Sequence, residues 1–161
     1  MLFRSAAALS YSEAAVADRD DLPLIWIARG DVILASREGR PDGCFQKAGS
    51  LSGEWSTQWI ISRVYRYYRQ FSRALQHAQA ALAIDAAQTS VWLQFGRCQL
   101  ELGLREPALK SFQTALELHP QNREAIEAMT EASQSGFRGS LLGWLRSEEH
   151  TSELQSPCNL V

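Results

Sequence analysis

The stretch between positions 89 and 122 carries a spaced set of aromatic, small and proline residues. In order along the chain, they are Trp92, Phe95, Gly96, Ala108, Phe112, Ala115 and Pro120. The first three lie at i, i+3 and i+4, which places them on one face of a helix, and the glycine lets a neighbouring helix come close. The next three form the facing stripe of a second helix, small where the two helices cross and large between the crossings. Because Gly103 suits a helix-ending turn and a proline cannot continue a helix, the stretch predicts two antiparallel helices and a stop.

This spacing resembles the tetratricopeptide repeat, a helix–turn–helix unit of about 34 residues. One position departs from the family pattern, which usually has tyrosine where this chain has Gln99. The resemblance implies an all-α fold, a right-handed superhelical solenoid of antiparallel helix pairs. A single unit of this kind cannot bury its apolar face alone, so the resemblance also implies a stack of units with an extended surface for a partner.

Earlier copies of the pattern occur at steps of 33 or 34 residues. The second-helix positions form the series Ala15, Ala48, Ala81, Ala115, the series Ala8, Pro41, Ala74, Ala108 and the series Ser12, Phe45, Ala78, Phe112. In the first helices, Ser62 precedes Gly96 by one period, and Trp26-x-x-x-Gly30 echoes Trp92-x-x-x-Gly96. Only 32 residues separate Gly30 from Ser62, so we expect the early repeat to be shortened in its glycine- and proline-rich turn.

The periodicity predicts a run of helices, and no stretch alternates long enough for a sheet. We expect helices over residues 6–17, 23–36, 41–51, 55–69, 72–84, 89–102, 105–118 and 123–134. These divide the chain into a truncated repeat at 6–20, a degenerate repeat at 21–54, repeats at 55–88 and 89–122, and a terminal capping region at 123–145. The apolar segment 137–145 is interpreted as a capping helix, with a membrane-surface anchor or a linker into a further domain as the alternatives.

Both ends of the chain look foreign to this pattern. Residues 146–156 read RSEEHTSELQS, which resembles the conceptual translation of a short-read sequencing adapter, and the last three residues resemble its continuation. Residues 2–5 resemble the opposite-strand translation of the same adapter. We therefore expect residues 1–5 and 146–161 to be artefactual, the latter disordered, and the first repeat to be cut in mid-unit.

The remaining residues give no pattern of catalysis or cofactor binding. His77 and His119 have no partner at metal-ligand spacing, and Cys44 and Cys98 lie in different repeats without a metal or redox spacing. No phosphate-binding loop, nucleophile elbow or metal-binding helix is present in the sequence. We therefore expect no enzyme activity, no cofactor and no metal site. The compartment stays open, with a lean to the cytoplasm, and the oligomeric state is not indicated.

The family resemblance implies that first helices line a concave groove for a peptide. Carried onto the matching positions, the expected groove residues are Trp59, Arg63, Arg66, Tyr67, Leu93, Arg97, Leu100 and Glu101. Arg63 and Arg97 occupy one column, so we expect two stacked guanidinium groups, and arginine binds carboxylates in bidentate fashion. Family members that clamp the C-terminal carboxylate of chaperones have asparagine in this column, so the clamp is not carried over. An alternative is that these arginines form a solvated face, with their stems packed over aromatic rings.

The sequence therefore favours a protein–protein interaction scaffold that binds a peptide or partner protein with acidic and apolar side chains. The runner-up is the repeat region of a larger enzyme, because in this family such arrays precede glycosyltransferase or sulfotransferase domains and recruit substrate. A structural spacer without a specific partner is a third alternative. Arginines and tyrosines between 63 and 73 also suggest a nucleic-acid surface, but the net charge of −2 and the acidic helix at 124–131 weigh against it. No segment has the roughly 20 apolar residues of a membrane span.

Overall fold

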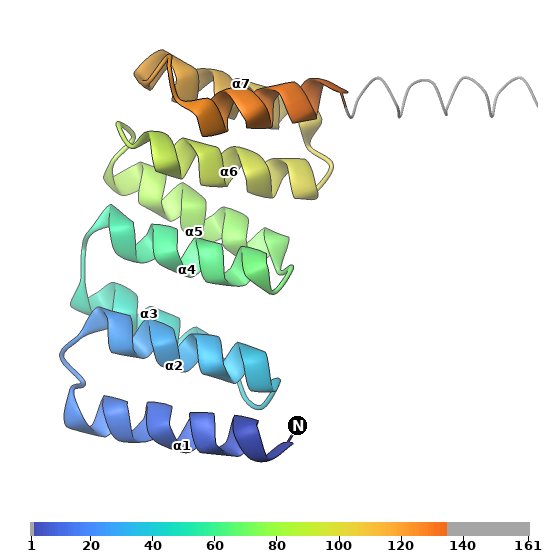
Figure 1. Cartoon of the computed structure of the whole chain (residues 1–161). Helices are drawn as coiled ribbons and strands as arrows, with labels where there is room; N and C mark the ends of the chain where they lie inside the picture. Colours follow the sequence, from blue (N-terminus) through green and yellow to red (C-terminus); the bar gives the residue numbers. More distant parts are fainter. Residues whose placement is uncertain (1, 135–161) are drawn as a thin grey trace, which may run out of the picture.

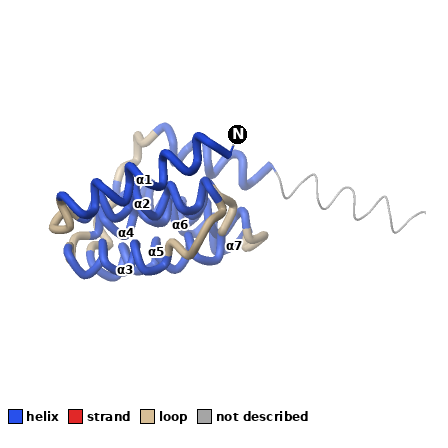
Figure 2. Tube along the Cα trace, turned by 90° about the horizontal axis from the view of Figure 1, so that it is seen from below, coloured by secondary structure: helices blue, strands red, loops and turns tan. Residues whose placement is uncertain are grey.

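A computed structural model of the chain describes residues 2–134, and every regular element in that range is a helix (Figures 1 and 2). The helices are α1 (Leu2–Asp18), α2 (Pro23–Ser36), α3 (Asp42–Leu51), α4 (Trp55–Tyr67), α5 (Phe71–Ile84), α6 (Thr89–Glu101) and α7 (Arg105–Leu118), and residues 123–134 are also helical. The bounds of α2 to α7 lie within two residues of those predicted, and the all-helical prediction is confirmed. The predicted capping segment at 137–145 and the adapter-like residues 146–161 lie outside the described residues.

The helices stack as antiparallel pairs in two rows (Figure 1). Helices α2, α4 and α6 form the first row, and α3, α5 and α7 form the second. Backbones approach closely between α2 and α4 and between α4 and α6, whereas among the described helices no such approach joins α3 to α5 or α5 to α7. A row whose members touch lies on the inside of a curved stack. The first row therefore forms the concave face, where the groove is predicted to lie.

The pairs α2–α3 and α6–α7 are held together by a glycine facing a phenylalanine. A Cβ built on Gly30 would lie 2.4 Å from a ring carbon of Phe45, and one built on Gly96 would lie 2.5 Å from the ring of Phe112. Both rings are almost wholly buried. Only glycine leaves room for such a ring against the helix backbone. The same glycine–phenylalanine contact therefore recurs in the repeats α2–α3 and α6–α7, which pack in the same way.

In the central pair α4–α5 the sizes of the two residues are reversed. The glycine position holds Ser62 and the phenylalanine position holds Ala78, and neither residue is exposed. The Ser62 hydroxyl donates a hydrogen bond to the carbonyl of Ala74 across the helix pair (2.8 Å), and the amide of Gln94 donates to the Ser62 oxygen (3.1 Å). A larger residue on one helix is thus matched by a smaller one on its partner, and the buried hydroxyl is satisfied.

Tryptophan indoles fix the loops that lead into two of the first helices. Nε1 of Trp26 donates to the carbonyl of Asp20 (2.9 Å), and Nε1 of Trp92 donates to that of Ala86 (2.8 Å). In both cases the acceptor lies six residues before the tryptophan. The sequence echo between these two tryptophans therefore reflects a shared loop geometry.

Two details differ from the expected repeat pattern. Ala48, Ala81 and Ala115 are fully buried, but Ala15 in the same column is exposed. Within the described residues α1 has only α2 to pack against, so the face that holds Ala15 is left open. The shortening of the early repeat lies only partly in its turn. Gly30 and Phe45 are 15 positions apart against 16 for Gly96 and Phe112, so one residue is missing between the two helix crossings as expected, and a second is missing between Phe45 and Ser62 (17 positions against 18 for Ala78 and Gly96). The helix α3 begins late, so it has 10 residues against the 14 of α5 and α7.

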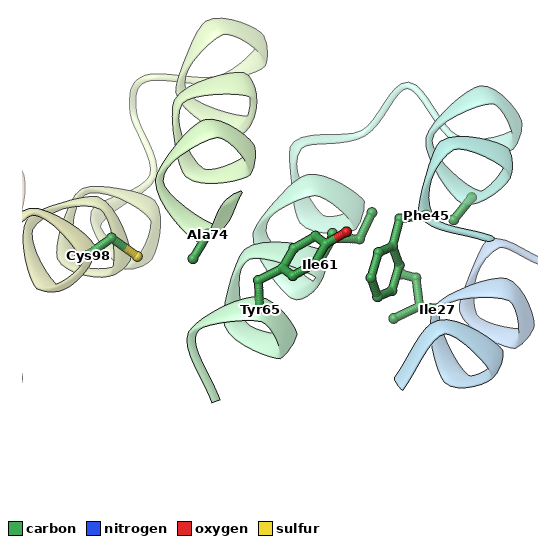
Figure 3. Close-up of a cluster of buried hydrophobic side chains, with 7 residues drawn as sticks. Ile27, Phe45, Ile61, Tyr65, Ala74 and Cys98 are labelled. Carbon is green, nitrogen blue, oxygen red and sulfur yellow. The ribbon is translucent and has the colours of Figure 1, made fainter. Parts of the chain in front are cut away.

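Tyr65 is the largest fully buried side chain of the core cluster shown in Figure 3. Its ring meets Phe45 edge to face (centroids 4.9 Å apart) and stacks on His77 (5.4 Å). Its hydroxyl donates to the Asp42 carboxylate (3.0 Å), and burial together with Asp42 raises the pKa of Tyr65 to about 12.

In the following repeat, the two positions that correspond to Tyr65 and His77 hold Gln99 and Ser111. The Ser111 hydroxyl donates to the Gln99 side-chain oxygen (2.7 Å). The one departure from the family pattern is thus compensated by a buried hydrogen bond at the paired position.

We expect the stability of the fold to fall as the pH is lowered from 7.5 to 5.5. Burial lowers the pKa of His77, whose Nδ1 lies 2.8 Å from the side-chain oxygen of Gln58. A group whose folded pKa lies below its unfolded value, about 6.5 for histidine, binds protons more readily in the unfolded chain. The loss therefore begins as the pH falls through that unfolded value and ends below the folded pKa. Thermal unfolding at each pH, followed by circular dichroism, measures it.

The matched controls for this pH dependence are His77→Gln, which cannot titrate, and His119→Gln at an exposed histidine. His77→Gln is expected to flatten the pH dependence between 5.5 and 7.5, and His119→Gln to leave it as in the parent chain. An unchanged slope in His77→Gln would show that another group is responsible.

Candidate functional site

A hollow of about 660 Å³ opens on the concave face between α2 and α4. It is lined by Asp31, Ile60, Arg63, Val64, Arg66, Tyr67 and Tyr68. We call it the groove hollow. All lining residues but one belong to α4 or to the residue that ends it, because a helix places residues three and four apart on the same face. Three of the residues predicted for the groove, Arg63, Arg66 and Tyr67, come together here.

The polar groups of the groove hollow have few internal partners. The Nε atom of Arg66 is buried and has no hydrogen-bond partner within the described residues. The Tyr68 hydroxyl donates to the backbone carbonyl of Asp31 (3.3 Å), and burial together with Asp31 raises the pKa of Tyr68 to about 12. Tyr67 is 80% exposed and meets Tyr68 edge to face. A buried donor without an acceptor is costly, so an oxyanion placed beside Arg66 would remove that cost.

Arg63 and Trp59 form a stacked pair at the border of the groove hollow. The guanidinium carbon of Arg63 lies 4.8 Å from the Trp59 ring centroid. The indole is itself held in place, because its Nε1 donates to the carbonyl of Ser90 at the start of α6 (3.1 Å). Arg63 remains exposed, so its charge is oriented by the ring and still accessible.

The structure separates the other predicted groove residues from the groove hollow. Leu93 is only 4% exposed and packs in the core with Phe112, and Leu100 packs against the same cluster. Glu101 is exposed at the last position of α6. The expected stack of two free guanidinium groups is not seen, because Nη1 of Arg97 forms an ion pair with the carboxylate of Glu124 (2.7 Å).

Four lining residues were missed by the sequence interpretation: Asp31, Ile60, Val64 and Tyr68. The signal for Asp31 was present, since it lies 32 residues before Arg63 and so belongs to the column of Arg63 and Arg97. Ile60 lies three residues before Arg63 and four before Val64, so each of these two residues shares a helix face with Ile60. Tyr68 lies beyond the end of α4, so its place in the groove hollow depends on how the turn is built.

The described residues give little support for metal binding, thiol chemistry or a membrane-spanning helix. No group of histidine, cysteine and acidic side chains in the described range could hold a metal ion. Cys44 and Cys98 are free and buried, and burial raises the pKa of the Cys98 thiol to about 11, which keeps it protonated and unreactive. None of the described helices is long and apolar enough to cross a membrane.

Stacked antiparallel helix pairs with a hollowed inner row define an α-solenoid of helical repeats. The family model of the tetratricopeptide repeat matches residues 68–132. The chain also superposes on the first tetratricopeptide domain of Spaghetti (RPAP3) bound to an HSP90 peptide, with a TM-score of 0.58, 21% identity and coverage of 70% of this chain and 91% of that one. Residues 68–132 therefore match the tetratricopeptide repeat, and the described helices have the tetratricopeptide-repeat fold.

Two curated proteins are similar in sequence to parts of the chain. Superkiller complex protein 3 of Mus musculus is 33% identical over 82 residues, 50% of this chain and 5% of that protein. The CTR9 homolog of Arabidopsis thaliana is 26% identical over 130 residues, 74% of this chain and 11% of that protein. The chain thus spans only a small fraction of the length of these relatives.

Proposed function

We propose that the chain is a protein-interaction module that binds a peptide with acidic and apolar side chains in the groove hollow. The observation that carries the proposal is the convergence of Arg63, Arg66 and Tyr67 on one concave surface, with a buried Arg66 nitrogen that has no internal acceptor. Guanidinium groups bind carboxylates through two parallel hydrogen bonds, and an exposed tyrosine offers rigid apolar area.

The comparisons support this class of function. The tetratricopeptide fold is generally a non-catalytic scaffold for protein interactions, and solenoids of this kind use their concave surfaces for binding. The Spaghetti domain, which shares the fold, is bound to a peptide that ends in Glu-Glu-Val-Asp. These points favour a binding module over the repeat region of a larger enzyme.

The chemistry of the groove hollow argues for a mixed partner rather than a purely anionic one. Asp31 contributes a carboxylate to the lining, and Ile60 and Val64 contribute apolar surface. A ligand that presented only negative charge would be repelled by Asp31 and would leave the apolar surface unused. An acidic residue beside Arg63 or Arg66 and an aliphatic residue over Ile60 satisfy both features.

We expect Arg63→Glu to weaken binding of a fluorescein-labelled SRMEEVD peptide by about tenfold, because it removes a charge-assisted contact worth about 1.4 kcal/mol or more. Fluorescence anisotropy with the full chain measures the affinity. Arg63 is the better target than Arg97, since it has no ion pair within the described residues, so its loss leaves no internal charge unpaired.

Lys110→Glu is the matched control for this experiment, because it makes the same change of charge at an exposed position on α7, in the outer row. It is expected to change the affinity less than twofold. Parent protein should also prefer SRMEEVD over SRMKKVK by at least about tenfold. Equal binding of the two peptides, or equal effects of the two substitutions, would contradict the proposal.

A further inference from the structure

The helices α2, α4 and α6 are each followed by a residue in the left-handed backbone conformation. These residues are Arg37 (φ 59°), Arg69 (φ 59°) and Gly103 (φ 77°). Glycine adopts this conformation without strain and is the usual residue at such a helix end. The last repeat follows that rule, whereas the two earlier repeats have arginine at the position.

The two strained arginines differ in what they contact. The guanidinium carbon of Arg69 lies 5.8 Å from the ring centroid of Phe71, so this side chain has a packing role inside its own turn. Arg37 has no ion pair and no side-chain hydrogen bond or ring contact within the described residues. A strained residue without an internal role is the kind of outlier that points to function.

Arg37 borders a second hollow, of about 810 Å³, at the turn edge of the stack. Its polar lining consists of Arg37, Arg40, Asp42, Tyr68, Gln70 and Arg73. We call it the arginine basin. Arg73 forms an ion pair with Asp42 (3.1 Å), which also accepts the Tyr65 hydroxyl. Arg40, like Arg37, has no ion pair within the described range. Three guanidinium groups thus face a single carboxylate that is already engaged.

The arginine basin belongs to the first two repeats and adjoins the groove hollow. Arg40 and Arg73 lie 33 residues apart, in one column, and Pro107 fills that column in the last repeat, where Gly103 also replaces the arginine at the helix end. Tyr68 lines both hollows. A peptide lying in the groove hollow can therefore continue past this ring into the arginine basin.

We propose that the arginine basin binds a cluster of acidic side chains on the same partner protein whose peptide occupies the groove hollow, an inference that rests on the proposed function. Arg37 and Arg40 would each hold a carboxylate with a bidentate fork, and Gln70 adds an amide donor. A nucleic-acid backbone fits less well, because Asp42 lies in the arginine basin, Asp31 lines the adjoining groove hollow and the whole chain has a net charge of −2.

The test uses the strain at Arg37 to separate binding from folding. Arg37→Gly removes one guanidinium and places the favoured residue in the left-handed conformation. We expect the midpoint of thermal unfolding to rise by about 3 °C, while the affinity of the full chain for a fluorescein-labelled hexaglutamate peptide falls at least about fivefold. A variant that folds better and binds worse cannot owe its weaker binding to unfolding.

Arg69→Gly is the matched control, because it makes the same substitution in the same conformation at the next turn, outside the arginine basin. It is expected to change hexaglutamate affinity less than twofold. Equal losses of hexaglutamate affinity in Arg37→Gly and Arg69→Gly would overturn the proposal. They would show that any positive charge at the turns attracts the peptide, whether or not it lies in the arginine basin. Tighter, Arg37-dependent binding of the heptanucleotide dT7 would also overturn it, in favour of a nucleic-acid partner.

This experiment also distinguishes the two proposals. Arg37→Gly leaves the groove hollow intact, and Arg63→Glu leaves the arginine basin intact. Loss of SRMEEVD binding in Arg63→Glu, with hexaglutamate binding unchanged in Arg37→Gly, would overturn only the arginine basin. Loss of hexaglutamate binding in Arg37→Gly, with SRMEEVD unaffected by Arg63→Glu, would overturn the groove hollow as the peptide site.

Discussion

Phe112→Ala is expected to lower the free energy of unfolding by about 3–5 kcal/mol, the range for removing a buried aromatic ring. The ring is fully buried, and it fills the space left by the missing side chain of Gly96. Its loss leaves a cavity at the centre of the α6–α7 crossing, and both helices are fixed on their outer sides by neighbours. Urea unfolding followed by circular dichroism measures the change, with Phe95→Ala, at a half-buried ring of α6 that meets Trp92 edge to face, as the matched comparison.

A double-mutant cycle tests whether the glycine and the ring are one packing unit. In the parent chain, Gly96→Ala places a Cβ about 2.5 Å from the ring and is expected to destabilise by about 1–3 kcal/mol through overpacking. In the Phe112→Ala background the same substitution should stabilise, since the space is free and alanine favours a helix over glycine by about 1 kcal/mol.

The chain already contains the swapped pair, with Ser62 opposite Ala78 in the central repeat. A sign change between the two backgrounds is therefore the expected result. If Gly96→Ala has the same effect in both, the contact with the ring is not what requires glycine there.

The helices and their packing columns could be predicted from the sequence because they depend on local spacing. Small residues at the period of the repeat mark the crossings, and Ala48, Ala81 and Ala115 are all fully buried as this requires. The exposure of Ala15 did not follow from the spacing, because burial depends on whether a partner helix is present. The column of a residue sets which way its side chain points, and the neighbouring helices determine whether that side chain is buried.

The site could be predicted only in part, for the same reason. The sequence places Arg63 and Arg97 in one column, but the structure gives the two arginines different environments. Glu124 on the next helix neutralises Arg97, while Arg63 stacks on a ring of its own helix. Pairing between repeats depends on how far one repeat is rotated against the next, and that rotation is not encoded in the spacing of a single repeat.

Turn geometry was the least predictable feature. The positive φ of Arg37 and the five-residue turn that follows α2 could not be read from a cluster of glycine and proline, which fits several turn types. The arginine basin depends on this turn. The sequence therefore indicated a groove along the first helices but not the second hollow at the edge.

Tyr65→Ala is expected to be as destabilising as Phe112→Ala, by about 3–5 kcal/mol. Tyr65 is 1% exposed and contacts two repeats, with Phe45 of the preceding repeat on one side of its ring and His77 of its own helix pair on the other (Figure 3 shows Tyr65 beside Phe45). Truncating it opens a cavity and also leaves His77 without its stacking partner. The measurement is again urea unfolding of the full chain.

Tyr65→Phe separates the contribution of the ring to the free energy of unfolding from that of the hydroxyl. It keeps the packing with Phe45 and His77 and loses only the hydrogen bond to Asp42, which is half exposed and retains its ion pair with Arg73. We expect a loss of about 1–2 kcal/mol, the range for a hydrogen bond to a charged group that water can partly replace. If Tyr65→Phe cost as much as Tyr65→Ala, the hydroxyl rather than the ring would join the repeats. The expected large difference in unfolding free energy between the two variants follows from geometry, because the ring packs on Phe45 of the preceding repeat and on His77, while the hydroxyl reaches one carboxylate at the protein surface.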